Sequence, residues 1–398
     1  MTRQKYIAYR IESLYGVEDA PFRRAMGNLL GPPLVAGNRL TELCNGDQIF
    51  PAMLAAIAGA RETITFETYI YWSGEIGRRF AEALAERAHA GVRVHVILDW
   101  FGARIESTYI DQMERAGVQI VKYHPLRWFN LSRLNYRTHR KLLVIDGRIG
   151  FTGGVGIADE WTGDAQDPDH WRDMHYQLEG PAVAQLQAAF MDNWIKTSDQ
   201  VLHGDAYFKP AEPAGDACCQ VFKSSPNEGS SSVRLMYLFS LAAARRHVRI
   251  ANSYFVPDEH AQQELVRARE RGVAVDIILP GGTIDYEAVR RASRANWGPL
   301  LEAGVRIWEY QPTMYHCKVM IVDDCWVSVG STNLDNRSFR LNDEANLNIH
   351  DREFAARQVE IFERDRERSR EVSLEEWRRR PLREKALEHF LNLFRSQL

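Results

Sequence analysis

The alternation of hydrophobic and polar positions predicts a strand–helix–strand order that occurs twice along the chain. In the first half, residues 64–70 alternate as a strand, and residues 75–90 carry apolar side chains at helical spacing up to a glycine where the next strand starts. In the second half, residues 248–256, 259–271 and 273–279 repeat this order. Strands that alternate with helices indicate an α/β fold in which helices cover a sheet.

A short motif shows the duplication most clearly. It consists of His-x-Lys, four apolar residues and Asp, and it occupies residues 139–146 and residues 316–323. Each copy is followed by a loop of small residues, Gly153-Gly154 in the first half and Gly330-Ser331 in the second. An interval of 177 residues between the two copies has the size of a domain, so the pattern predicts two homologous domains.

We therefore expect two domains, each a mixed β-sheet flanked by helices, with one active site at their interface. The first domain is predicted at residues 36–200 and the second at residues 216–370, with a polar linker at residues 201–215. A helical lead-in at residues 1–35 precedes them, and a helical tail at residues 371–398 follows.

Composition is typical of a soluble globular enzyme. The chain has 398 residues, of which 45% are hydrophobic, and its formal net charge is −3. No segment has the length and apolar character of a membrane span or of a secretory signal. The five cysteines lack the spacing of a metal site, so reduced thiols in a cytoplasmic protein are expected.

The residue types of the motif favour phosphoryl chemistry. In an extended chain, residues i and i+2 face the same side, so His139 points with Lys141 and His316 points with Lys318. One imidazole can attack phosphorus while the other protonates the departing oxygen, and the lysines are expected to hold permanent positive charge against the phosphate.

The other polar residues of the motifs have either a structural or a catalytic interpretation. Asp146 and Asp323 face the opposite side and adjoin turn residues, so we expect structural roles in the turns. Asp173 and Glu344 stand at equivalent places after the motifs and could each orient a histidine; alternatively, they are solvated acids. Ser331 and Asn333, which lie in the loop after the second motif, are either hydrogen-bond donors to phosphate or ordinary loop caps.

With these motifs the chain resembles the phospholipase D superfamily, whose signature is His-x-Lys-x4-Asp followed by a Gly-Gly or Gly-Ser-x-Asn loop, present twice. It is most similar to the bacterial cardiolipin synthases of the short type that lack N-terminal membrane spans. The resemblance covers roughly residues 36–380. The matching segments are residues 66–71, 135–141, 157–161, 171–173, 254–258 and 330–335.

The resemblance implies a two-step mechanism without a metal or other cofactor. One histidine forms a phosphohistidine intermediate while the other protonates the leaving alcohol, and a second alcohol or water then resolves the intermediate. By family practice His139 is the nucleophile and His316 the acid. Lys141, Lys318 and Asn333 match the phosphate-binding positions of the family.

The first half departs from the family pattern at one position. Its loop reads Gly153-Gly154-Val155-Gly156, where the family usually has Asn in the last place. We therefore expect an asymmetric site in which only the second half offers the amide of Asn333.

The substrate class rests on two segments. Residues 115–145 contain seven Lys or Arg and no acidic residue, and the C-terminal helix expected at residues 386–398 has an apolar side. The first segment could lie on an anionic bilayer, grip nucleic acid, or fill the core with its aromatic rings. The second could anchor at the membrane surface or dock on its own domain. The aromatic residues of the first segment are Tyr123, Trp128, Phe129 and Tyr136, and the apolar side of the second is formed by Leu387, Phe390, Leu391 and Phe394.

These observations favour a phosphatidyltransferase that joins two phosphatidylglycerol molecules into cardiolipin and releases glycerol. The expected partners are an anionic phospholipid and the inner face of the cell membrane, to which the protein would bind peripherally. A phospholipase D hydrolase or headgroup exchanger is the first alternative, and a nuclease is less favoured because the net charge is −3. A non-catalytic membrane-binding protein is disfavoured by the intact motifs. Both half-sites lie in one chain, so no dimer is required.

Overall fold

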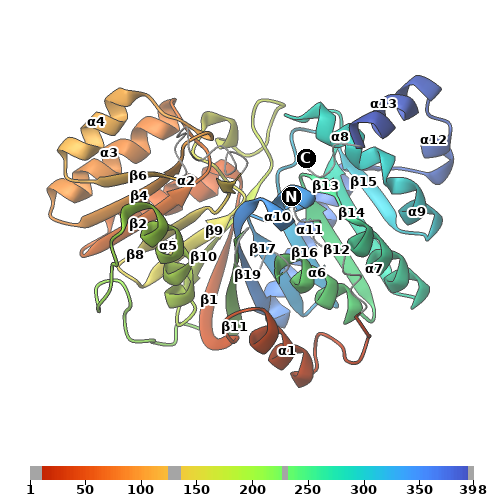
Figure 1. Cartoon of the computed structure of the whole chain (residues 1–398), viewed down its shortest axis with the longest axis horizontal. Helices are drawn as coiled ribbons and strands as arrows, with labels where there is room; N and C mark the ends of the chain where they lie inside the picture. Colours follow the sequence, from red (N-terminus) through yellow and green to blue (C-terminus); the bar gives the residue numbers. More distant parts are fainter. Residues whose placement is uncertain (1–10, 124–135, 226–231, 393–398) are drawn as a thin grey trace, which may run out of the picture.

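The computed structural model describes residues 11–123, 136–225 and 232–392, which form a 16-stranded mixed sheet covered by helices on both faces. The two halves of the chain lie side by side, with the first half at the left of Figure 1 and the second half at the right. From the outer edge inward, the first half contributes β6 (Gln119–Tyr123), β4 (Arg93–Asp99), β2 (Thr63–Thr68), β8 (Leu142–Ile145), β9 (Ile149–Gly153), β10 (Met174–Glu179) and β1 (Val35–Cys44).

The second half repeats this strand order. Its strands are β15 (Arg306–Tyr310), β14 (Ala274–Pro280), β12 (His247–Asn252), β16 (Lys318–Val322), β17 (Trp326–Gly330), β19 (Asn342–His350) and β11 (Ala217–Ser224). The innermost strands β1 and β11 pair antiparallel, so the sheets of the two halves are continuous. A short β20 (Ser369–Glu371) extends the outer edge at β15, and β7 (Arg137–Thr138) pairs with β19.

Helices cover both faces of the sheet. One hydrophobic cluster spans both halves beneath α5 (Val183–Ser198) and α11 (Arg352–Glu367). On the other face, the first half is covered by α2 (Asn45–Ala58), α3 (Glu75–His89) and α4 (Ser107–Arg115). The second half is covered there by α1 (Ala20–Leu30), α6 (Ser232–Ala242), α7 (Glu259–Glu270) and α9 (Trp297–Glu302).

This layering explains the four apolar residues of each motif. In β8, Leu142 and Val144 belong to the cluster shared by the two halves, whereas Leu143 and Ile145 pack under the helices of the opposite face. The equivalent strand β16 alternates in the same way. A strand that is buried on both faces needs a continuous apolar run, and both motifs supply one.

The motif aspartates lie in the turns that follow these strands. Both have a positive φ of 52°. The Asp146 carboxylate accepts the backbone N–H groups of residues 61–63 at 2.7 to 2.9 Å, and the Asp323 carboxylate accepts those of residues 245–247 at 2.8 to 2.9 Å. Each aspartate thus connects its turn to the start of the neighbouring strand β2 or β12.

Several predicted elements differ in extent from those observed. Within residues 11–35, the described part of the lead-in, the helix is α1, which begins beside a proline, and residues 11–19 form no helix. The strand expected at residues 248–256 is broken after Asn252 by a bend at Ser253, and the chain resumes as β13 (Phe255–Val256). Residues 201–215 contain no helix or strand.

The C-terminal helix begins earlier than expected. It is α13 (Leu382–Asn392), which packs beside α8 (Glu287–Ala295). Leu387 and Phe390 remain 42% and 56% exposed, so the helix docks on its own domain with part of its apolar side uncovered. The predicted apolar residue Phe394 lies outside the described residues. Among the helices that the structure describes, none has the length and hydropathy needed to cross a membrane.

Candidate active site

Both histidine segments cross to the opposite half of the molecule. In the first half, β7 pairs parallel with the start of β19, and the His139 N–H donates to the Asp343 carbonyl at 2.9 Å. In the second half, Tyr315 pairs with Arg172, and the His316 N–H donates to the Arg172 carbonyl at 2.8 Å. The two crossings bring the motifs together at the interface of the halves.

As a result, each imidazole contacts a carboxylate from the other half. His139 Nδ1 lies 3.0 and 3.1 Å from the two carboxylate oxygens of Glu344, and His316 Nδ1 lies 2.7 Å from Asp173 Oδ2. The sequence pointed to both acids through their equal placement after the motifs, but it left open which histidine each would contact. A carboxylate on Nδ1 fixes the orientation of each ring. Lys318 Nζ lies 3.2 Å from Nε2 of His316.

The carboxylates are themselves held in place. Asp173 accepts hydrogen bonds from the Trp161 indole at 2.9 Å and from the Met174 N–H at 2.8 Å. Glu344 accepts a hydrogen bond from the Ser331 hydroxyl. Ser331 is fully buried, and its hydroxyl is turned toward this acid. Its contact therefore supports a histidine-orienting acid, rather than the phosphate contact expected from the sequence.

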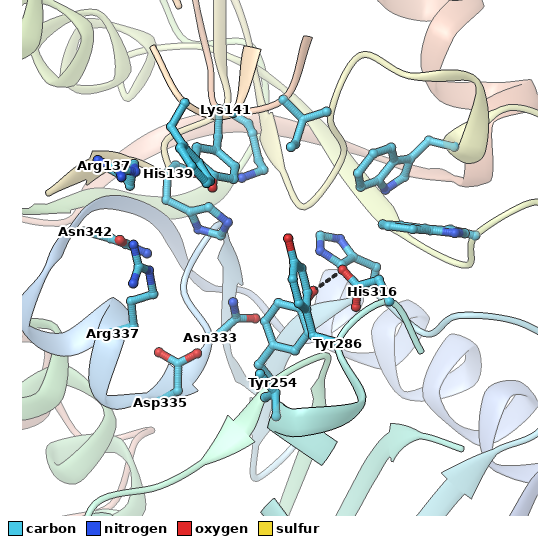
Figure 2. A pocket seen from close by; sticks show the side chains of 18 of the residues that line it. Arg137, His139, Lys141, Tyr254, Tyr286, His316, Asn333, Asp335, Arg337 and Asn342 are labelled. Atoms are coloured by element: carbon cyan, nitrogen blue, oxygen red, sulfur yellow. Dashed lines mark hydrogen bonds between the residues drawn. The ribbon is translucent and has the colours of Figure 1, made fainter. Parts of the chain in front are cut away.

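The motifs face one cavity of about 510 Å³. His139, Lys141, His316 and Asn333 line it, and Figure 2 shows the two imidazoles on facing sides of the space, with Asn333 below them in this view. Lys318 lies beside this wall: its Nζ donates to Ser253 Oγ at 2.6 Å, and Ser253 donates to Asn333 Oδ1 at 2.8 Å.

Burial changes the charges at the site. It lowers the pKa of His139 to about 4 and the pKa of His316 to about 3, which favours the neutral form of both imidazoles. It also lowers the pKa of Lys141 to about 7, and the pKa of Lys318 is lowered as well. Desolvation thus disfavours the charged form of Lys141, which the sequence led us to expect as a permanent cation.

The asymmetry expected from Gly156 has a steric basis. A Cβ atom at Gly156 would lie 2.6 Å from Ile70 Cβ, so the Asn that the family usually has here would not fit. Tyr69 lies on the same wall, with its ring centroid 5.3 Å from that of His139 and 5.7 Å from Lys141 Nζ. The first half thus presents an apolar and aromatic wall where the second half presents Ser253 and Asn333.

Aromatic rings also surround the second histidine. The ring centroids of Trp161, Trp171 and Tyr254 lie 5.3, 5.5 and 6.1 Å from that of His316. A site role for these residues was not expected from the sequence, although each lies in a segment that carries the family resemblance. Their positions could have been inferred only from the fold.

The basic segment at residues 115–145 is only partly accessible to a membrane. Tyr123 is buried and donates to the Asp343 carboxylate, while Arg140 is fully buried and lies 3.1 Å from Asp192 Oδ2. For these two residues the surface interpretation is wrong, because they build the interior beneath the first motif. Trp128 and Phe129 lie outside the described residues.

Comparison with known proteins gives the family. The family described as "Cardiolipin synthase, PLD-like domain" matches residues 53–194 and 237–366. Cardiolipin synthase A of Pseudomonas putida is 37% identical over 360 residues, which cover 89% of this chain and 74% of that protein. Cardiolipin synthase 1 of Bacillus cereus is 34% identical over 363 residues, which cover 88% and 71%.

Solved structures show the same fold at low sequence identity. Phosphatidylserine synthase of Haemophilus influenzae Rd KW20 superposes with a TM-score of 0.74 at 16% identity, covering 96% of this chain and all of that one. Polyphosphate kinase of Porphyromonas gingivalis gives a TM-score of 0.57 at 15% identity, covering 98% of this chain and 57% of that one. With both motifs facing one cavity, the chain belongs to the phospholipase D superfamily, in the family of cardiolipin synthase PLD-like domains.

Proposed function

We propose that the protein is a phosphatidyltransferase that makes cardiolipin from two phosphatidylglycerol molecules and releases glycerol. The observation that carries the proposal is the pair of imidazoles in one cavity, each held at Nδ1 by a carboxylate of the other half. The names of the relatives, which are cardiolipin synthases, support cardiolipin as the product.

In the first step, His139 Nε2 attacks the phosphorus of one phosphatidylglycerol, forming a P–N bond. The P–O bond to the terminal glycerol breaks, and His316 supplies the proton that the glycerol oxygen takes up. In the second step, a hydroxyl of another phosphatidylglycerol returns a proton to His316 and attacks phosphorus. The P–N bond breaks, which restores His139 and yields cardiolipin.

The proposed phosphate ligands are Lys141, Lys318 and Asn333. Burial favours the neutral forms of both imidazoles and, in part, of Lys141. A bound phosphodiester brings a negative charge into this buried space and raises the pKa of each of these groups. With the substrate bound, His316 can therefore take up from solvent the proton that it needs as general acid.

We further propose peripheral binding at the inner face of the cell membrane, with an anionic phospholipid entering from the bilayer. The partly exposed Leu387 and Phe390 of α13 and the aromatic lining of the cavity support this proposal. We also propose that the two homologous domains extend over residues 36–200 and 216–370.

Hydrolysis and headgroup exchange use the same intermediate and differ only in the molecule that resolves it. The test is mass spectrometry of the lipids formed when the purified protein is incubated with phosphatidylglycerol vesicles, with His139→Ala as control. We expect cardiolipin and glycerol from the wild type and neither from the control. Phosphatidic acid alone would show a phospholipase, and the absence of any lipid product would contradict the proposal.

A further inference from the structure

Two arginines from opposite halves of the chain line the cavity in addition to the motif residues. Arg137 lies in β7, Arg337 lies in α10 (Asn336–Arg340), and Asn342, the register partner of Arg137 at the start of β19, lines the same wall. Figure 2 shows the three side chains grouped on one side of the cavity, with His316 on the other. The proposed mechanism uses none of them.

Arg137 is built into the wall in a fixed position. It is 7% exposed, and its guanidinium stacks over the rings of Phe101 at 4.8 Å and Trp100 at 5.4 Å. Its Nη1 donates to the Tyr136 carbonyl at 2.8 Å, whereas its Nε has no hydrogen-bond partner within the part of the chain that the structure describes. A buried guanidinium N–H without an acceptor is costly unless a ligand supplies one.

Two carboxylates lie close to these arginines, Asp99 near Arg137 and Asp335 near Arg337. Burial lowers the pKa of Arg137 and the positive charge of Arg337 adds to this effect, whereas the negative charge of Asp99 opposes it. The neighbouring acids are engaged by backbone N–H groups: Asp335 caps α10 by accepting the Ser338 N–H at 2.7 Å, and Asp99 accepts three backbone N–H groups at 2.9 to 3.1 Å. Two guanidiniums that face one space favour an anion between them.

We propose that Arg137, Arg337 and Asn342 bind the phosphodiester of the second phosphatidylglycerol, the acceptor lipid. This inference rests on the proposed function, in which the motif residues hold the reacting phosphate. Cardiolipin carries two phosphodiesters joined through the three carbons of a glycerol, so the second anion must lie in the same cavity at a separate place. Guanidinium groups suit it because they can donate two parallel hydrogen bonds to a phosphate.

The consequence is selection between alcohols at the second step. Water and simple alcohols that resolve the intermediate carry no phosphate and gain nothing from the arginines. An acceptor lipid gains hydrogen bonds to charged groups, which are worth about tenfold or more in binding. The arginine pair therefore favours transfer to lipid over hydrolysis.

The test measures the ratio of two transfer products from one vesicle preparation. Phosphatidylglycerol vesicles are incubated with the protein in a fixed concentration of ethanol, and cardiolipin and phosphatidylethanol are quantified by mass spectrometry. For Arg337→Gln we expect the ratio of cardiolipin to phosphatidylethanol to fall about tenfold or more. Arg137→Lys, which keeps the charge but loses the planar fork, should lower the same ratio.

Arg340→Gln is the matched control, because Arg340 lies on the same short helix but is exposed to solvent. It removes the same charge from the surface, and its ratio should stay within about twofold of the wild type. An unchanged ratio in Arg337→Gln and Arg137→Lys would overturn the inference, as would an equal fall in Arg340→Gln. If the wild type formed cardiolipin but the arginine variants gave the same product ratio as the wild type, only this inference would fail. If the wild type formed no cardiolipin, the proposed function would be contradicted as well.

Free phosphate could supply the same anion chemistry, so inorganic phosphate is added in a second series. A wild-type ratio that does not respond to inorganic phosphate supports an acceptor lipid as the ligand. A ratio that collapses at phosphate concentrations well below that of the lipid, in the wild type but not in Arg337→Gln, would overturn the assignment to lipid.

Discussion

At the scale of single residues, Asp173 illustrates how the opposite half fixes a reactive ring. Its carboxylate contacts the His316 imidazole, the Trp161 indole and the Met174 N–H, so it has one orientation. We expect Asp173→Asn to lower kcat by about 100-fold or more, because the amide cannot stabilise an imidazolium. KM and the melting temperature should change little, since the substitution keeps the shape of the side chain.

The pH profile distinguishes this positioning role from a structural one. If Asp173 stabilises the protonated form of His316, Asp173→Asn should shift the alkaline limb of kcat to lower pH, because the general acid then loses its proton more readily. A wild-type kcat, or a loss of activity with an unshifted profile and a lowered melting temperature, would contradict the role.

Lys141 is predicted to lower the stability of the protein. Burial lowers its pKa to about 7, whereas a lysine in an unfolded chain has a pKa of about 10.4. As the pH falls below about 10, the lysine of the unfolded chain binds a proton, whereas the buried Lys141 of the folded protein stays neutral until lower pH. The free energy of unfolding therefore decreases, and this decrease is complete only below the pKa of the folded state. Lys141→Met should therefore raise the free energy of unfolding by about 1–2 kcal/mol at pH 7 and by less near pH 10, while activity is lost.

Urea denaturation at both pH values measures this effect. Lys122→Met, at an exposed position of β6, is the control and should change the free energy of unfolding by no more than about 0.5 kcal/mol. A destabilised Lys141→Met protein at pH 7 would contradict the argument.

What the sequence could predict at this scale depends on repetition and on the family resemblance. Asp173 and Glu344 were singled out because they stand at equivalent places in the two halves, and Gly156 because the family usually has Asn at this position. Arg137 and Arg337 have no such counterparts. They meet only because β7 crosses to β19, and no local pattern encodes that pairing.

At the scale of elements, the turns after β8 and β16 depend on the motif aspartates. Asp146 accepts three backbone N–H groups at the start of β2 and lies away from the cavity-lining residues. We expect Asp146→Asn to reduce the free energy of unfolding by about 1–2 kcal/mol, because hydrogen bonds to a charged group become hydrogen bonds to a neutral one. The kcat of the folded fraction should remain within about threefold of the wild type. A larger loss of kcat without a loss of stability would assign Asp146 a role in the chemistry.

Element order followed from the sequence, whereas the joining of the two sheets did not. The helix predicted at residues 75–90 is α3, and the fold class of two mixed sheets flanked by helices is confirmed. The pairing of β1 with β11 connects strands more than 170 residues apart, and apolar periodicity carries no information about such partners. The break after Asn252 could not be predicted, because Ser253 and Tyr254 fit a strand pattern, although they lie between β12 and β13 and Tyr254 lines the cavity.

At the scale of the whole molecule, one chain contains a complete site. His139 pairs with Glu344 and His316 pairs with Asp173 within the same chain. We therefore expect no recovery of activity when inactive His139→Ala and His316→Ala proteins are mixed, at any ratio and after incubation long enough for subunit exchange. Recovery of more than about a tenth of the wild-type rate would show that the site is shared between chains.

The covalent intermediate in this shared cavity is the central claim, and one measurement tests it directly. Wild-type protein is mixed with phosphatidylglycerol vesicles, quenched in neutral denaturant during turnover, and analysed by intact-protein and peptide mass spectrometry. The account predicts an added mass of one phosphatidyl group on the peptide that contains His139, absent from His139→Ala. An enzyme that makes cardiolipin while carrying the adduct on another peptide, or while never carrying one, would contradict it.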